Sequence, residues 1–197
     1  MLVLTDLTAL IPPAWREIVD LDRLRQISKE IGSDFIPDPK LIFRSVECAP
    51  SDVKVVIVGQ DPYPNPQHAM GLAFSVPAEI EVLPASLKNI YKELKADLGV
   101  IRENGDLSGW SEQGVLLLNM SLTVLPNQTG SHSKIGWQVI TQQIISDVAK
   151  RGALAVLWDE RHNLCQNILR KKINLLHRTQ VHFLFTVVFM EASHLVM

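Results

Sequence analysis

The sequence has little of several features that would narrow its function at once. Only two cysteines, Cys48 and Cys165, occur among 197 residues, and no Cys-x-x-Cys pair is present. This disfavours a disulfide-stapled secreted domain and a zinc site of that type. No apolar run approaches the roughly 20 residues that a membrane-spanning helix needs. The first residues lack a basic start and carry Asp6, unlike a signal peptide. We therefore expect a cytoplasmic protein with reduced thiols and no membrane association.

Charge of one sign and glycine-rich loops are also scarce. The formal net charge is −2, so the overall charge does not indicate a nucleic-acid partner, although a local basic face is compatible with it. Neither a GxGxxG nor a GxxxxGK pattern occurs, which argues against an unrelated nucleotide-binding α/β protein. Hydrophobic residues make up 47% of the chain, enough for one sizeable core. We interpret residues 1–197 as a single domain.

Three short apolar runs predict strands that are buried on both faces, at residues 55–58, 115–118 and 153–158. Amphipathic segments between them predict helices, so the fold class is α/β, with a parallel twisted sheet flanked by helices. The helical segments that we predict are residues 15–31, 40–46, 87–98, 107–113, 137–150 and a further one around 164–169. Ser86 is the expected N-cap of one helix, and Gly32 and Gly99 are expected to end two others.

Polar residues follow two of these strands. Gln60 and Asp61 come directly after the first strand, and Asn119 ends the second. The carboxyl ends of parallel strands share one edge of a sheet, which is where ligands bind in such folds. We expect Gly59 to let the backbone turn sharply at the strand end. Taken singly, each polar residue is more often a turn former than a site residue.

Four longer motifs carry more information than these single residues. In chain order they are GQDPY at 59–63, GLAFSV at 71–76, QGVLLLN at 113–119 and SHSKIGW at 131–137. Together they closely resemble the family 1 uracil-DNA glycosylases, from near residue 15 to about residue 158. The resemblance implies a sheet of about four strands and hydrolysis of the N-glycosidic bond of uracil in DNA. It also implies uracil-containing DNA as the partner and no metal or organic cofactor, and we expect a monomer.

The resemblance implies a role for each matching residue. Asp61 resembles the carboxylate that positions the attacking water and stabilises positive charge on the deoxyribose. Gln60 belongs to the same loop. Tyr63 resembles the ring that fills the space beside uracil C5 and excludes the methyl group of thymine. Phe74 resembles the aromatic that stacks on the flipped base. Asn119 resembles the amide that reads the uracil edge and rejects cytosine.

General chemistry agrees with these implied roles. A base inside a duplex is unreachable, so it must be extruded and read in a pocket. A buried amide left unpaired by the wrong base costs more than a lost methyl contact. A carboxylate beside a developing cation is electrostatic catalysis. The resemblance also places Pro84 and Ser86 in the proline-rich loop that presses on the DNA backbone.

The sequence departs from the family at two single positions. Pro64 stands where the family often has His, which removes a polar partner near Asp61. Asp159 stands where the family usually has Gly, in a loop that approaches DNA phosphates. A carboxylate there would repel phosphate or instead cap the following helix.

The tail, residues 174–197, departs further. The family carries an HPSPLS loop whose His stabilises the departing uracil anion, and no Pro-Ser-Pro follows Lys172 here. Codons for residues 177–197, read one base out of register, permit HPSPLSVYRGF. We hypothesise that the gene is read in a shifted frame from around residues 173–177, the other reading being an unrelated natural tail. The alternative function is then a catalytically crippled remnant that binds uracil or DNA weakly.

Overall fold

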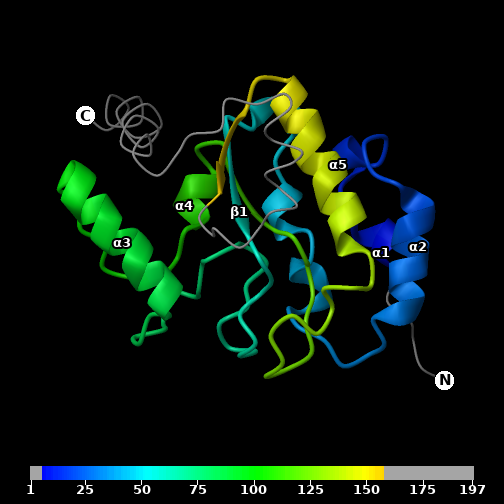
Figure 1. Cartoon of the computed structure of the whole chain (residues 1–197), viewed down its shortest axis with the longest axis horizontal. Coiled ribbons are helices and arrows are strands. Elements are labelled where there is room, and N and C mark those ends of the chain that lie inside the picture. Colours follow the sequence, from blue (N-terminus) through cyan, green and yellow to red (C-terminus); the bar gives the residue numbers. More distant parts are fainter. Residues whose placement is uncertain (1–5, 158–197) are drawn as a thin grey trace.

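The computed structural model describes residues 6–157, and its centre is a three-stranded parallel sheet (Figure 1). Strand β1 (Val55–Gly59) lies between β2 (Val115–Asn119) and β3 (Leu154–Leu157). Val55 is paired with Val115 on one side and with Leu154 on the other. The α/β class, the parallel sheet and all three strands are confirmed. The predicted helix at 164–169, a fourth strand, Asp159 and the tail lie outside the described residues.

The two faces of the sheet carry separate hydrophobic clusters because successive side chains of a strand point to opposite faces. On one face Val56 and Val58 pack with Leu116, Leu118 and residues of α1 (Leu7–Leu10), α2 (Leu21–Glu30) and α5 (Trp137–Lys150). On the other face Val55, Ile57, Val115 and Leu117 pack with residues of α3 (Ala85–Leu98) and α4 (Ser108–Ser111). The sheet is therefore covered by helices on both sides, as Figure 1 shows.

The helices after β1 largely follow the prediction. Helix α5 has the predicted bounds, and α3 ends at Gly99, whose φ of 70° is the left-handed conformation that glycine tolerates. The predicted N-cap of α3 is wrong. Pro84 occupies the N-cap position without a capping side chain, and Ser86 lies inside the first turn. The Ser86 hydroxyl is therefore available for the pocket.

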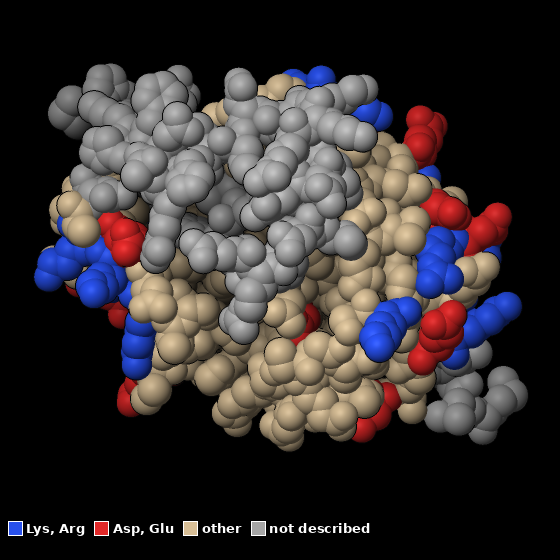
Figure 2. Space-filling model, in the orientation of Figure 1, with Lys and Arg blue, Asp and Glu red and all other residues tan. Residues whose placement is uncertain are grey.

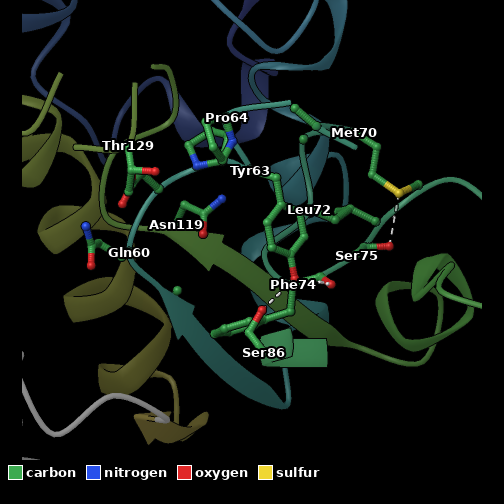
Figure 3. Close-up of a pocket in the computed structure, with 15 residues that line it drawn as sticks. Gln60, Tyr63, Pro64, Met70, Leu72, Phe74, Ser75, Ser86, Asn119 and Thr129 are labelled. Atoms are coloured by element: carbon green, nitrogen blue, oxygen red, sulfur yellow. Dashed lines mark hydrogen bonds between the residues drawn. The ribbon is translucent and has the colours of Figure 1, made fainter. Parts of the chain in front are cut away.

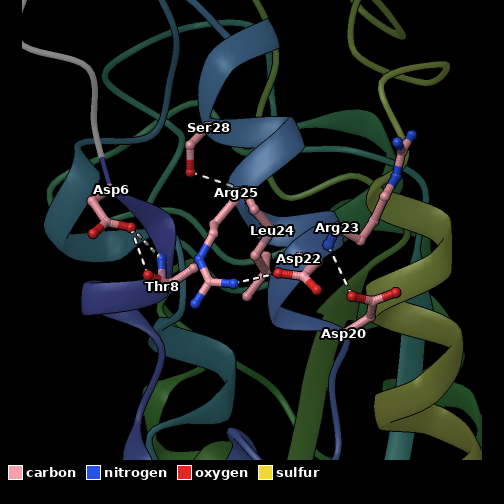
Figure 4. Close-up of polar contacts among 8 residues, drawn as sticks. All are labelled: Asp6, Thr8, Asp20, Asp22, Arg23, Leu24, Arg25 and Ser28. Atoms are coloured by element: carbon pink, nitrogen blue, oxygen red, sulfur yellow. Dashed lines mark hydrogen bonds and ion pairs between the residues drawn. The ribbon is translucent and has the colours of Figure 1, made fainter.

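The N-terminal layer corrects the single helix predicted at 15–31. A 3₁₀ turn, η1 (Pro13–Trp15), precedes a separate helix α2, which Asp20 caps by accepting a hydrogen bond from the Arg23 amide at 2.9 Å. Helix α1, which the sequence did not predict, is capped by Asp6 (Figure 4). A short Asp or Asn side chain satisfies the free amides of a first turn, so Asp20 restarts the helix where the stripe of apolar residues continues.

The segment predicted as one helix at 40–46 is two 3₁₀ turns, η2 (Pro39–Leu41) and η3 (Arg44–Val46), and Asp38 caps the first. A further turn, η4 (Pro50–Asp52), leads into β1. Arg44 connects this region to the rest of the fold. Its guanidinium donates to the Met70 carbonyl at 3.2 Å and to the Ser108 hydroxyl at 2.9 Å.

The surface is mixed in charge on the face that Figure 2 shows, where Lys and Arg lie among Asp and Glu rather than in a single-sign patch. Within residues 6–157, no helix is both long enough and apolar enough to cross a membrane.

Candidate active site

A pocket of about 240 Å³ opens at the carboxyl ends of β1 and β2 (Figure 3). Its lining comes from the loop after β1, the segment 69–75, the first turn of α3, the end of β2 and Thr129. Six of the seven predicted site residues line it, namely Gln60, Asp61, Tyr63, Phe74, Ser86 and Asn119. Pro84 does not line the pocket and lies two residues before Ser86. The structure therefore brings together residues that are up to 59 positions apart in the chain, from Gln60 to Asn119.

Gly59 gives Asn119 its space. A Cβ atom at residue 59 would lie 2.3 Å from Asn119 Oδ1 and 3.1 Å from the Ala73 Cβ. The backbone bends at residues 60 and 61, directly after Gly59, although the φ of Gly59 is not in the left-handed region. Its missing side chain is what lets the Asn119 amide, only 7% exposed, lie across the end of β1.

Backbone hydrogen bonds continue the pairing of β1 and β2 beyond the strands themselves. The Met120 amide donates to the Gly59 carbonyl at 2.9 Å, and the Ser121 amide donates to the Gln60 carbonyl at 3.0 Å. The loop that carries Asp61 and the end of β2 that carries Asn119 are thereby held in fixed relation.

Asp61 is held from the far side by the loop of residues 125–132. The Gly130 amide donates to Asp61 Oδ2 at 2.6 Å, and the Asn127 amide donates to the Pro64 carbonyl at 2.8 Å. A carboxylate that accepts a bond from a fixed backbone amide has a defined orientation. Sequence reasoning missed both contacts, because a backbone donor leaves no mark in the residue type.

A buried network anchors this loop to helix α5. The Trp137 indole donates to Thr123 Oγ1 at 2.8 Å, and Thr123 Oγ1 lies 2.8 Å from His132 Nδ1. The indole N–H donates and the Thr123 oxygen accepts, while Thr123 and His132 share a second hydrogen bond in which a neutral imidazole can take either role. Burial lowers the pKa of His132, in agreement with a neutral ring. The motif SHSKIGW thus supplies an anchor for the loop that contacts Asp61.

The opposite wall is held by side-chain hydroxyls. The Tyr63 hydroxyl donates to the Phe74 carbonyl at 3.1 Å and lies 2.8 Å from the Ser86 hydroxyl. Burial raises the pKa of the Tyr63 phenol, and the hydrogen bond with Ser86 opposes this rise. Phe74 has a φ of 65°, which is uncommon for any residue other than glycine. Met70, Leu72, Ser75 and Thr129 also line the pocket and were not predicted individually as site residues.

The chemical character of the pocket is now defined. It offers one oriented carboxylate, one buried neutral amide and two aromatic side chains, a set suited to a planar polar heterocycle next to a developing positive charge. Among residues 6–157, no cluster of three or more His, Cys, Asp or Glu side chains could hold a metal ion.

Comparisons with known proteins relate this chain to one enzyme family. A sequence model of the uracil DNA glycosylase superfamily matches residues 46–191. A uracil-DNA glycosylase from Chromobacterium violaceum is 44% identical over 172 residues, which cover 80% of this chain and 72% of that protein. A uracil-DNA glycosylase from Campylobacter lari is 40% identical, with 93% of this chain and 80% of that protein covered.

Solved structures show the same likeness. The crystal structure of mimivirus uracil-DNA glycosylase is similar with a TM-score of 0.76 and 29% sequence identity, covering 88% of this chain and 70% of that one. A structure from Nitratifractor salsuginis, at 19% identity and a TM-score of 0.67, shares the fold. The family match reaches residue 191, beyond residue 158, where the resemblance that we identified from the motifs ends.

Proposed function

The chain belongs to the uracil DNA glycosylase superfamily, and we propose that it hydrolyses the N-glycosidic bond of uracil in DNA. The products are free uracil and DNA with an abasic site, which is the substrate for the next step of base excision repair. The observation that supports this proposal most directly is that one pocket is lined by Asp61, Asn119, Tyr63 and Phe74.

Asp61 is the group that we assign to the bond-breaking step. As the bond between the sugar C1′ and the uracil N1 breaks, positive charge develops on the deoxyribose and negative charge on the leaving base. A carboxylate held by the Gly130 amide is already oriented before the reaction, so it needs no rearrangement to stabilise that positive charge. It also orients the water whose oxygen forms the new bond to C1′.

The remaining pocket residues are assigned to recognition. The Asn119 amide, buried above Gly59, hydrogen-bonds to the donor and acceptor edge of uracil. Cytosine presents the opposite pattern and would leave that amide unpaired. The Tyr63 ring blocks a methyl group at C5, and the Phe74 ring stacks on the base. A pocket of this size at the end of the strands accepts a single base, so the base has to leave the duplex first.

We propose that the partner is uracil-containing DNA bound by a cytoplasmic monomer, with Ser86 and Pro84 beside the DNA backbone. Ser86 reaches the pocket from the first turn of α3, so a strand whose base occupies the pocket passes close to both residues. No metal or organic cofactor enters the proposed reaction.

The alternative function, a remnant that binds uracil or DNA without catalysis, is less well supported. The related proteins are named as uracil-DNA glycosylases, and they align with most of this chain. The frame-shift hypothesis for residues 174–197 stays a prediction. Resequencing of the codons around residues 173–177 tests it, and a single uninterrupted frame would contradict it.

The proposed reaction is tested by measuring free uracil released from a single-stranded oligonucleotide that contains one uracil. We expect release by the full chain, no release from the same oligonucleotide carrying thymine, and a loss of about a hundredfold to a thousandfold in kcat for Asp61→Asn. The replacement keeps the shape and still accepts the Gly130 hydrogen bond, so DNA affinity is expected to stay unchanged.

Two results would contradict the proposal. Full activity of Asp61→Asn would show that the carboxylate has no role in the chemistry. Absence of uracil release by the full chain, with normal binding of the oligonucleotide, would support the non-catalytic alternative.

A further inference from the structure

The Phe74 backbone is held in an unfavourable conformation between two firm attachments. Its φ of 65° lies in the left-handed region, which costs a residue with a side chain about 1–2 kcal/mol. On one side of it, the Ala73 amide donates to the Leu117 carbonyl of β2 at 3.0 Å. On the other side, the buried Ser75 hydroxyl accepts from the Leu107 amide at 2.9 Å. Such conformations persist only where the surroundings enforce them.

The Tyr63 hydroxyl adds a third attachment, directly on Phe74. A phenol has one proton to donate, and a carbonyl can only accept. The Tyr63 proton therefore goes to the Phe74 carbonyl, at 3.1 Å, and the Ser86 hydroxyl donates to the Tyr63 oxygen, at 2.8 Å. Figure 3 shows the three residues converging at the lower end of the pocket.

We propose that the Tyr63 hydroxyl is a positioning group for Phe74, separate from the Tyr63 ring that faces the base. It fixes the Phe74 carbonyl and so the left-handed backbone that sets the direction of the Phe74 ring. Through Ser86 the same hydroxyl also attaches the first turn of α3 to this wall. The proposal rests on the proposed function for its link to uracil, but the hydrogen bonds themselves do not depend on it.

The division of labour within Tyr63 has a consequence for specificity. Removing the hydroxyl leaves the ring in place, so a methyl group at C5 still meets the same wall. What is lost is the restraint on Phe74, and with it the preformed stacking surface. Affinity for uracil and discrimination against thymine therefore depend on different parts of one side chain.

Tyr63→Phe tests this proposal, and Tyr91→Phe is its matched control. The Tyr91 hydroxyl also donates to a backbone carbonyl, that of Asn104 at 2.7 Å, and Tyr91 does not line the pocket. In the full chain we expect Tyr63→Phe to weaken binding of free uracil about fivefold to twentyfold and to raise KM similarly. The kcat value is expected to change less, and thymine release to remain undetectable. Tyr91→Phe is expected to leave both constants within twofold.

A second measurement separates the proposal from the proposed function. The ¹³Cα and carbonyl chemical shifts of Phe74 report its backbone conformation without substrate. We expect them to move in Tyr63→Phe and not in Tyr91→Phe. Unchanged Phe74 shifts would overturn the positioning role whether or not the chain releases uracil. Unchanged uracil affinity despite moved shifts would overturn the link between Phe74 position and binding, while the glycosylase proposal would stand.

Discussion

The two sides of the pocket are held by different kinds of hydrogen bond. On the Asp61 side, backbone amides of residues 127 and 130 donate to the loop after β1. On the Phe74 side, the hydroxyls of Tyr63, Ser75 and Ser86 add three side-chain contacts to the backbone bond from Ala73 to Leu117. A side-chain hydroxyl can be deleted by one substitution, whereas a backbone amide persists through almost any substitution. The Asp61 side is therefore sensitive to backbone geometry, and the Phe74 side to side-chain identity.

This difference predicts which side of the pocket each kind of substitution disturbs. Substitutions that change the course of the main chain should affect the Asp61 carboxylate and the Asn119 amide. Substitutions that remove single oxygen atoms should affect the stacking surface. Three further experiments test this comparison, and they concern the backbone-held side and its anchor.

Gly59→Ala should have the largest effect. The new Cβ would lie 2.3 Å from Asn119 Oδ1, so the amide has to move away from the base position. A displacement of about 1 Å at such a site lowers kcat/KM about a hundredfold. The measurement is kcat/KM for uracil release.

Gly109→Ala is the control for this substitution, because residue 109 has open space around it and no left-handed φ. It should keep full activity. Near-normal activity of Gly59→Ala would mean that the position of the Asn119 side chain does not limit the reaction.

Gly130→Ala should have an intermediate effect. Residue 130 has a φ of 72°, and its added Cβ would meet only Gln60 Nε2, at 4.0 Å. The change therefore acts through backbone strain of about 1–2 kcal/mol rather than through a clash. We expect the amide that holds Asp61 to shift, with kcat about tenfold lower and KM within twofold.

Gly32→Ala provides the matching strain elsewhere, since residue 32 has a φ of 69° and nothing within 4 Å. It should lose similar stability, measured by urea unfolding, and keep the wild-type kcat. An equal fall in kcat for both variants would assign the effect to global stability instead of Asp61 orientation.

His132 should have the smallest effect, and only on stability. Burial lowers its pKa in the folded state below the ordinary value of 6.5, so the unfolded chain binds the proton more readily. This contribution to stability is complete above pH 6.5 and is lost as the pH falls from there toward the folded pKa. One proton changes the free energy of unfolding by at most about 1.4 kcal/mol per pH unit.

His132→Asn keeps an acceptor near the Nδ1 position but does not titrate. Urea unfolding between pH 7.5 and 5.5 should therefore show a smaller loss of stability for the variant than for the wild type. Parallel stability curves would mean that another group carries the pH dependence of this region.

Much of the fold could be predicted because it depends on the type and order of residues. The runs at 55–58 and 115–118 are apolar without interruption, which is typical of strands covered on both faces, and the structure buries both. The bounds of α5 followed from its apolar stripe and from Lys150 at its end. The prediction of one helix at 15–31 was wrong because the stripe of apolar residues continues across Asp20, where a capping side chain interrupts the helix.

The candidate site was predictable in membership but not in its contacts. The motifs identified Asp61, Tyr63, Phe74 and Asn119, and the structure places them around one pocket. They did not reveal the Gly130 amide, because a backbone donor is common to all residues except proline. The helix pattern, in turn, misassigned Ser86 as a helix cap, since the same residue type serves equally well as a hydrogen-bond partner of Tyr63.

Because the 125–132 loop acts through its backbone, one of its side chains can be replaced by a label. Gln128 is exposed at its tip, while the amides of Asn127 and Gly130 on either side reach the loop that carries Asp61. A fluorescent or spin label attached at residue 128 would therefore sit two residues from the carboxylate's donor without replacing any group that forms the pocket. That position offers a way to follow the arrival of DNA at the site in real time.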